Sequence, residues 1–149
     1  MNMNSQQITK DISIGAQPSE QDLKQLAREG VKTVINLRVE NEQEDQLSPI
    51  DEGQTARDLG MEYLHIPVIG DQIREGQVDE FRNAVENLPK PIYAHCAKGK
   101  RAATLCMMDR GMREGWSGKE TVAQAKEMGF DFNPNLEKFM QEYVDARKA

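Results

Sequence analysis

The segment PIYAHCAKGKRAATLCMM, residues 91–108, decides the fold of this chain. Residues 91–96 form a short apolar segment, as expected of a strand buried inside a sheet. Gly99 then permits backbone conformations that other residues avoid, and a helix is predicted to begin near Arg101. A buried strand that runs through a tight loop into a helix is the building unit of α/β folds.

Segments typical of strands and helices alternate along the rest of the chain. A weak first strand contains Ile8, Ile12 and Ile14, and stronger strands are predicted over residues 31–37 and 61–69. Helices are predicted over residues 19–29, 49–59, 77–88, 117–128 and 135–147. This alternation predicts one α/β domain over residues 1–149, a three-layer arrangement in which helices flank a central, mostly parallel sheet of four to five strands.

The composition excludes several classes of protein. The 149 residues include 19 Lys and Arg against 25 Asp and Glu, a net charge of −6. An acidic surface argues against binding to nucleic acid or to anionic lipid. No apolar stretch is long enough for a membrane span or resembles a signal peptide, so a cytoplasmic location is expected. Only Cys96 and Cys106 are present, too few for a disulfide scaffold, and no metal or cofactor site is predicted.

One basic segment interrupts this acidic chain. Residues 87–108 contain no Asp or Glu. In α/β sheets, ligands bind where strands end and helices begin. Backbone N–H groups and the helix dipole would there attract an oxyanion and favour the thiolate form of Cys96, and the planar fork of Arg101 could bind two oxygens of that anion. The predicted anion-binding residues are His95, Ala97, Lys98, Gly99, Lys100 and Arg101.

The stretch HCAKGKR, residues 95–101, resembles the active-site loop of cysteine phosphatases of the dual-specificity type, with the pattern His-Cys-x-x-Gly-x-x-Arg-Ser/Thr. The resemblance extends to a small bacterial phosphatase-like group named after the N-terminal region of β-lactamase-hydrolase-like proteins. It rests there on GAQPS (15–19), VKTVINLR (31–38), YLHIPV (63–68) and AKEMGFDFNPNLEKFMQEY (125–143), which together span nearly the whole chain.

The resemblance implies a cysteine phosphatase fold and a role for each matching residue. Cys96 would be the nucleophile that forms a phosphocysteine, Arg101 would bind the phosphoryl oxygens, and His95 would orient Cys96. Asp71, in the loop after YLHIPV, would be the general acid, with Glu75 as the alternative. The substrate would be a phosphorylated protein or small molecule, and no metal or other cofactor would be needed.

Two departures from the phosphatase pattern leave alternatives open. Four residues separate Cys96 from Arg101, where the common loop has five. Many rhodanese-type sulfurtransferases share the shorter spacing, so one alternative is a sulfurtransferase with a persulfide on Cys96. Ala102 stands where the family has a hydroxyl, with Thr104 the nearest substitute, so hydrolysis of the intermediate is expected to be slow. The other alternative is therefore a pseudo-phosphatase that binds phosphate without turnover.

Other polar residues near the predicted site allow more than one interpretation each. Lys98 and Lys100 would either bind a polyanionic substrate or strengthen the local positive field. Arg38, Glu40 and Glu42, after the strand over residues 31–37, would form a solvated loop, form a salt bridge that braces the active loop, or contact the substrate. Cys106 lies about three helical turns beyond Cys96, too far for an easy disulfide, and is expected in the core.

Overall fold

The structure is a computed structural model that describes residues 5–39, 46–70 and 72–147. Its strands are β1 (Ser5–Thr9), β2 (Ile12–Gly15), β3 (Thr33–Asn36), β4 (Glu62–His65) and β5 (Ile92–His95). Its helices are α1 (Glu20–Arg28), α2 (Pro49–Asp58), α3 (Glu75–Asn87), α4 (Lys100–Glu114), α5 (Gly118–Glu127) and α6 (Pro134–Arg147).

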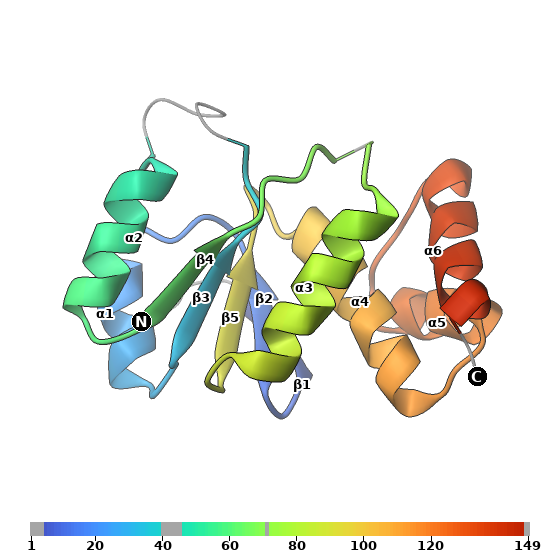
Figure 1. The fold of residues 1–149 in the computed structure, drawn as a ribbon, viewed down its shortest axis with the longest axis horizontal. Coiled ribbons are helices and arrows are strands. Elements are labelled where there is room, and N and C mark those ends of the chain that lie inside the picture. Colours follow the sequence, from blue (N-terminus) through green and yellow to red (C-terminus); the bar gives the residue numbers. More distant parts are fainter. Residues whose placement is uncertain (1–4, 40–45, 71, 148–149) are drawn as a thin grey trace.

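The strands form one sheet in the order β1-β2-β5-β3-β4 (Figure 1). Strands β2, β5, β3 and β4 are parallel, and only β1 runs antiparallel to its neighbour. The predicted α/β class and the mostly parallel sheet are confirmed. His95, the last residue of β5, is in register with Gly15 of β2 and with Asn36 of β3. The carboxyl ends of three strands therefore meet around the residue that precedes Cys96.

The first predicted strand is wrong in one respect. Ile8 belongs to β1, whereas Ile12 and Ile14 belong to β2, and the two strands form an antiparallel hairpin. The chain reverses at Lys10 and Asp11, where the Asp11 N–H donates to Thr9 Oγ1 at 3.1 Å. The apolar residues of both strands are buried in the same core cluster, so their spacing alone resembles that of one strand.

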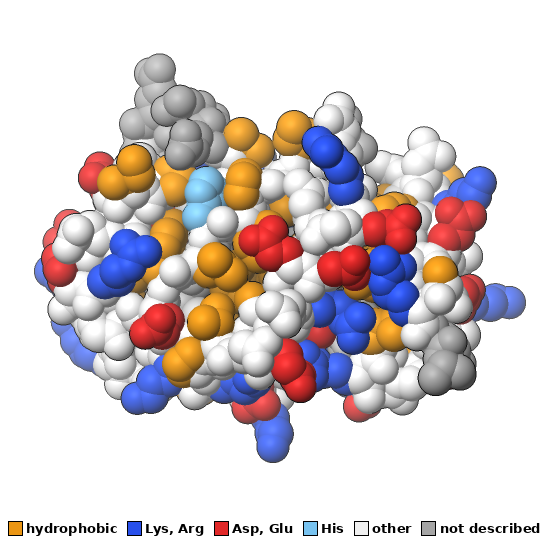
Figure 2. Space-filling view, viewed as in Figure 1, with side chains coloured by type: hydrophobic (Ala, Val, Ile, Leu, Met, Phe, Trp, Pro, Cys, Tyr) orange, Lys and Arg blue, Asp and Glu red, His pale blue; other side chains and the backbone are white. Residues whose placement is uncertain are grey.

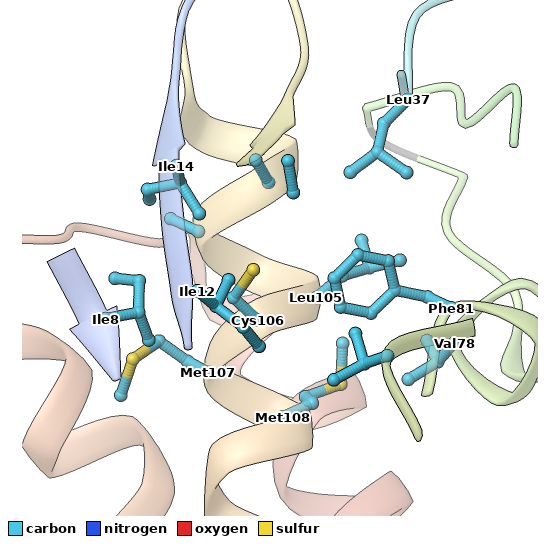
Figure 3. Close-up of a cluster of buried hydrophobic side chains, with 14 of the residues drawn as sticks. Ile8, Ile12, Ile14, Leu37, Val78, Phe81, Leu105, Cys106, Met107 and Met108 are labelled. Carbon is cyan, nitrogen blue, oxygen red and sulfur yellow. The ribbon is translucent and has the colours of Figure 1, made fainter. Parts of the chain in front are cut away.

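Helices cover both faces of the sheet (Figure 1). Because side chains alternate along a strand, Val34 and Tyr93 pack in one cluster with residues of α1 and α2, whereas Ile35 and Ala94 pack in the larger cluster. Figure 3 shows that larger cluster, in which α4 lies between the hairpin and α3. It includes Ile8, Ile12, Ile14, Val78, Phe81, Leu105, Cys106, Met107 and Met108.

Local capping interactions explain where several helices begin. The Ser19 hydroxyl accepts a hydrogen bond from the Asp22 N–H, and the Ser48 hydroxyl accepts one from the Asp51 N–H. Such caps satisfy N–H groups that have no partner inside the helix. The predicted starts of α1 and α2 are confirmed, whereas α3 begins at Glu75, two residues before the predicted Gln77.

The visible surface carries both signs of charge. Figure 2 shows Asp and Glu side chains mixed with Lys and Arg over α3 and α6. Arg147 of α6 lies 3.0 Å from Glu75 Oε1 and 3.2 Å from Asp79 Oδ1, both on α3. Among the helices in the described ranges, none combines the length and the apolar character needed to cross a membrane.

The contact between α5 and α6 depends on Gly118. A Cβ at this position would lie 2.3 Å from the backbone O of Gln141, which cannot move without the helix. We expect Gly118→Ala to lower the free energy of unfolding by about 1–3 kcal/mol in urea denaturation. Gly76→Ala is the control, because a Cβ there meets no atom within 4 Å. Equal stability of the two variants would contradict this interpretation.

Candidate active site

The loop between β5 and α4 follows the central strand of the sheet. β5 ends at His95, Cys96 follows, and Gly99 precedes the first residue of α4. Gly99 has a φ of 105°, in the left-handed region that favours glycine. Its backbone also lies close to β2, since a Cβ at Gly99 would be 3.7 Å from Gly15 C and O. The predicted order of strand, loop and helix is confirmed.

The Cys96 thiol lies at the bottom of this loop. Cys96 is 1% exposed, and the Gly99 N–H donates to its Sγ at an N–S distance of 3.1 Å. The N–H groups in the first turn of α4 point toward the same loop, because N–H groups at a helix start have no intrahelical acceptor. These donors and the helix dipole together favour binding of an anion above Sγ.

Arg101 lies in the first turn of α4, where Nη1 donates to the backbone O of Val68 at 2.8 Å. Its aliphatic stem lies near Gly70, with Cγ and Cδ 3.9 Å from where a Gly70 Cβ would be. The segment after β4 therefore holds the guanidinium on the same side of the loop as Cys96. A planar guanidinium in this position can bind two oxygens of a phosphoryl group.

One cavity of about 360 Å³ is lined by both the predicted nucleophile, Cys96, and the predicted phosphate-binding arginine, Arg101. It is lined by Gly70, Cys96, Ala97, Lys98, Lys100, Arg101, Thr104, Asn133 and Leu136. A second cavity of about 380 Å³ adjoins it and shares Lys98 and Lys100. Both lysines are exposed. Of the predicted loop residues, Ala97, Lys98, Lys100 and Arg101 thus line the cavity with Cys96, whereas Gly99 lines only the adjoining cavity and the buried His95 lines neither.

The predicted general acid has no described position. Asp71 lies outside the described residues, and its role stays a prediction. The alternative, Glu75, is the first residue of α3 and pairs with Arg147 at 3.0 Å. It is not among the residues that line the cavity with Cys96. Thr104 does line that cavity, but its hydroxyl donates to the Lys100 backbone O at 2.9 Å, as Thr often does inside helices.

His95 is held from two sides. Its Nε2 lies 2.5 Å from Glu52 Oε2, and its Nδ1 lies 3.2 Å from the Cys96 backbone O. Glu52 belongs to α2 and is 0% exposed. Glu52 is not among the site residues that the sequence predicts. The available signal is its position on the buried face of α2 with Pro49, Gly53 and Ala56, where a carboxylate needs a polar partner.

The surroundings of Arg38 exclude one of the interpretations that the sequence leaves open. Arg38 is 2% exposed, so it is not a solvated loop residue. Its Nη1 donates to Gln17 Oε1 at 2.5 Å, and Gln17 Nε2 donates to Glu52 Oε1 at 2.7 Å. Arg38 therefore braces the active loop through intervening side chains. Glu40 and Glu42 lie outside the described residues.

The second cysteine has a different environment. Cys106 is fully buried in the core, as predicted. Burial raises the pKa of its thiol well above the ordinary value, and the negative charge of Asp109 adds to this effect. Cys106 therefore stays a neutral thiol at physiological pH. In the described part of the chain, no three His, Cys, Asp or Glu side chains are grouped so that they could bind a metal ion.

This domain has a mostly parallel sheet whose central strand is followed by a cysteine, an N–H-lined loop and an arginine at a helix start. It has the cysteine phosphatase fold. The family model described as "Beta-lactamase hydrolase-like protein, phosphatase-like domain" matches residues 4–112. The chain belongs to this family, which confirms the resemblance seen in the sequence.

Curated relatives carry the same description. The chain is 30% identical to a β-lactamase hydrolase-like protein of Agrobacterium fabrum over 129 residues, which are 87% of this chain and 30% of that protein. It is 30% identical to a protein of the same description from Xylella fastidiosa over 124 residues, 83% of this chain and 29% of the relative. The chain therefore spans about 30% of the length of these relatives.

Solved structures share the fold over most of their length. A candidate phosphatase from Neisseria meningitidis is 25% identical, with a TM-score of 0.77 over 92% of this chain and 96% of that one. Tk-PTP in its active form is 19% identical, with a TM-score of 0.81 over 99% of both chains. The core catalytic domain of the PP-IP phosphatase SIW14 from S. cerevisiae is 18% identical, with a TM-score of 0.74 over 96% of this chain and 86% of that domain.

Proposed function

We propose that this domain is a cysteine-dependent phosphatase that hydrolyses phosphate monoesters through a phosphocysteine. The observation that carries the proposal is the 3.1 Å contact between Gly99 N and Cys96 Sγ, in one cavity with Arg101. This arrangement provides a nucleophile, an anion-binding backbone and a bidentate cation around one point, which phosphoryl transfer requires. Membership of a phosphatase-like family supports the proposal.

The reaction has two steps. In the first, Cys96 Sγ attacks the phosphorus, a P–S bond forms and the P–O bond to the leaving group breaks. Arg101 and the loop N–H groups stabilise the charge on the other phosphoryl oxygens. The leaving oxygen takes a proton from a general acid, for which Asp71 stays the prediction. In the second step, the general acid, now deprotonated, takes a proton from a water molecule that attacks the phosphorus. The P–S bond breaks, and phosphate and the Cys96 thiolate are released.

The second step is expected to be the slower one. Ala102 offers no hydroxyl next to Arg101, and the Thr104 hydroxyl donates to the Lys100 backbone O. In the related phosphatase pattern, the hydroxyl after the arginine helps the thiolate to leave. With an aryl phosphate we therefore expect one rapid equivalent of phenol per enzyme, followed by slower turnover.

The proposed substrates are phosphorylated proteins or small phosphorylated molecules. Lys98 and Lys100 line both the cavity that contains Cys96 and the cavity beside it. A substrate with a second anionic group would meet their positive field while its phosphoryl group lies at Cys96. Both lysines are exposed, so their attraction for such a substrate is expected to be modest and sensitive to salt.

Removal of both lysines tests this substrate class. We expect Lys98→Ala/Lys100→Ala to raise KM for a bisphosphorylated small molecule by roughly threefold to tenfold, with much less effect on KM for phenyl phosphate. The difference should disappear at high salt. Lys119→Ala, which removes an exposed lysine on α5, is the control. An equal effect on both substrates would contradict a role in binding a second anion.

A second candidate is a sulfurtransferase. The observation in its favour is the spacing of four residues between Cys96 and Arg101, which rhodanese-type loops share. Cys96 would take the outer sulfur atom of thiosulfate as a persulfide and release sulfite. It would then transfer that sulfur to cyanide and form thiocyanate.

A paired assay of the purified chain separates these functions. Phosphate release from an aryl phosphate, inhibited by vanadate, is expected of the phosphatase. Thiocyanate formation from thiosulfate and cyanide without phosphate release would overturn the proposal in favour of the sulfurtransferase. Phosphate binding with neither activity would indicate a pseudo-phosphatase.

A further inference from the structure

Four polar side chains form a chain of hydrogen bonds that ends at His95, next to Cys96. Arg38 donates to Gln17, and Gln17 donates to Glu52 Oε1. The other Glu52 oxygen faces His95 Nε2 at 2.5 Å. Glu52 and His95 are both 0% exposed, and the two-step reaction above assigns no role to Glu52. A carboxylate buried this deeply needs a reason, because its desolvation is unfavourable.

Both ring nitrogens of His95 face oxygen atoms. Nδ1 lies 3.2 Å from the Cys96 backbone O, which can only accept a hydrogen bond, so Nδ1 must carry a proton. Nε2 faces the Glu52 carboxylate, and a hydrogen bond there needs a second proton between ring and carboxylate. The pair therefore holds one proton more than a carboxylate and a neutral imidazole would. With that proton on the ring, His95 is an imidazolium.

Two tyrosines surround this pair. The Tyr93 ring stacks on His95 with centroids 5.9 Å apart, and Tyr63 lies beside Glu52 from β4. Burial raises the pKa of both phenols well above the ordinary range. Negative charge adds to this effect, chiefly from Glu52 at Tyr63 and from Asp22 at Tyr93. Both tyrosines therefore stay neutral, so neither adds a charge beside Glu52 and His95, and the Tyr63 hydroxyl is hydrogen-bonded to the Glu52 carboxylate.

The remaining charges alternate in sign. Arg38 is positive and reaches Glu52 through Gln17, Glu52 is negative, and a doubly protonated His95 is positive. Cys96 comes next in the chain, and its backbone O accepts from His95. A thiolate at Cys96 completes the alternation, whereas a neutral His95 would leave Cys96 next to a pair of net negative charge.

We propose that Glu52 is a positioning residue that keeps His95 doubly protonated and so favours the thiolate form of Cys96. This inference deepens the proposed function, since it concerns the proposed nucleophile. Its test does not require phosphatase activity, because a thiolate reacts with an alkylating reagent whether or not the domain turns over a substrate.

The test compares the wild type with Glu52→Gln, which keeps the shape of the side chain and removes its charge. A Gln amide can donate to His95 Nε2, and its carbonyl can still accept from Gln17, so the hydrogen bonds are kept while His95 becomes neutral. The rate of Cys96 alkylation by iodoacetamide is measured from pH 4 to 9, with the modified cysteine identified by mass spectrometry. We expect the midpoint of this profile to move upward by about one pH unit or more.

A second buried carboxylate provides the matched control. Asp109 of α4 is 0% exposed and pairs with Arg113 at 2.8 Å and with Arg82 at 3.4 Å, away from His95. Asp109→Asn removes a buried charge in the same way, and thermal unfolding shows how much stability each variant loses. We expect Asp109→Asn to leave the alkylation profile of Cys96 unchanged. An equal shift in both variants would mean that loss of stability alone explains the result and would overturn the proposal.

His95→Asn tests whether Glu52 acts through the imidazole. If Glu52→Gln does not fold, the alkylation profile of His95→Asn is the test of the proposal. We expect this variant to move the profile in the same direction, and Glu52→Gln to add little in its background, because residues that act as one unit are not additive. An unshifted Glu52→Gln profile, or fully additive effects, would overturn the role of Glu52. A shifted profile without phosphate release would instead refute the proposed function alone.

Discussion

Cys96→Ser is expected to reduce phosphate release by at least about a thousandfold, because the hydroxyl is a far weaker nucleophile than a thiolate at neutral pH. The substitution replaces only the sulfur atom by the smaller oxygen, and the Gly99 N–H can still donate to the serine oxygen. Binding of vanadate or phosphate should therefore persist. The measurements are the initial rate with an aryl phosphate and the dissociation constant for phosphate by calorimetry.

Cys106→Ser is the control for this prediction. It makes the same chemical change in the core, where burial keeps the Cys106 thiol neutral. Its new hydroxyl can donate to a backbone carbonyl one turn earlier in α4. We expect a small loss of stability and nearly unchanged activity. Retained phosphate release in Cys96→Ser would exclude a phosphocysteine mechanism.

Arg101→Lys is expected to lower kcat/KM by roughly a hundredfold to a thousandfold, although the positive charge is kept. A lysine has one ammonium and cannot bind two phosphoryl oxygens in a plane. All three donors of the ammonium are on one nitrogen, so it also cannot keep the Val68 contact and both phosphoryl contacts at once, as the separate nitrogens of Arg101 allow. Most of the loss should fall on kcat, because the arginine binds the transition state more tightly than the substrate.

Arg110→Lys, farther along α4, is the matched control for Arg101→Lys. Its guanidinium lies 5.1 Å from the centre of the Trp116 ring, and Nη1 contacts Met128. We expect its steady-state kinetics to match those of the wild type. If Arg101→Lys also kept wild-type kcat/KM, bidentate binding of the phosphoryl group would be excluded.

The candidate loop could be predicted because its determinants are adjacent in the chain. A β-branched or apolar strand, a glycine with positive φ and a helix start occur within residues 92–101, and each acts over a few residues. The Ser19 and Ser48 caps are local for the same reason, since each side chain bonds to a backbone N–H three residues ahead. Cys96, Gly99 and Arg101 meet because the loop between them is short.

The hairpin and the buried charges could not be predicted in this way. Ile8, Ile12 and Ile14 are buried together whether they lie on one strand or on two, so hydrophobic spacing does not distinguish the cases. Arg38 follows a strand and looks like a surface residue. It is buried because Gln17, 21 residues earlier, supplies an acceptor for its guanidinium.

The class of fold, the family and the loop that contains Cys96 and Arg101 can be predicted from the sequence, because these depend on periodicity, turns and caps within short segments. The residues that surround this loop are brought there by tertiary packing. Glu52 and His95 are 43 residues apart in the chain, and the packing of α2 against the sheet brings them together. A buried charge is stabilised by such partners. Because the partners are far apart in the chain, no short sequence pattern predicts them.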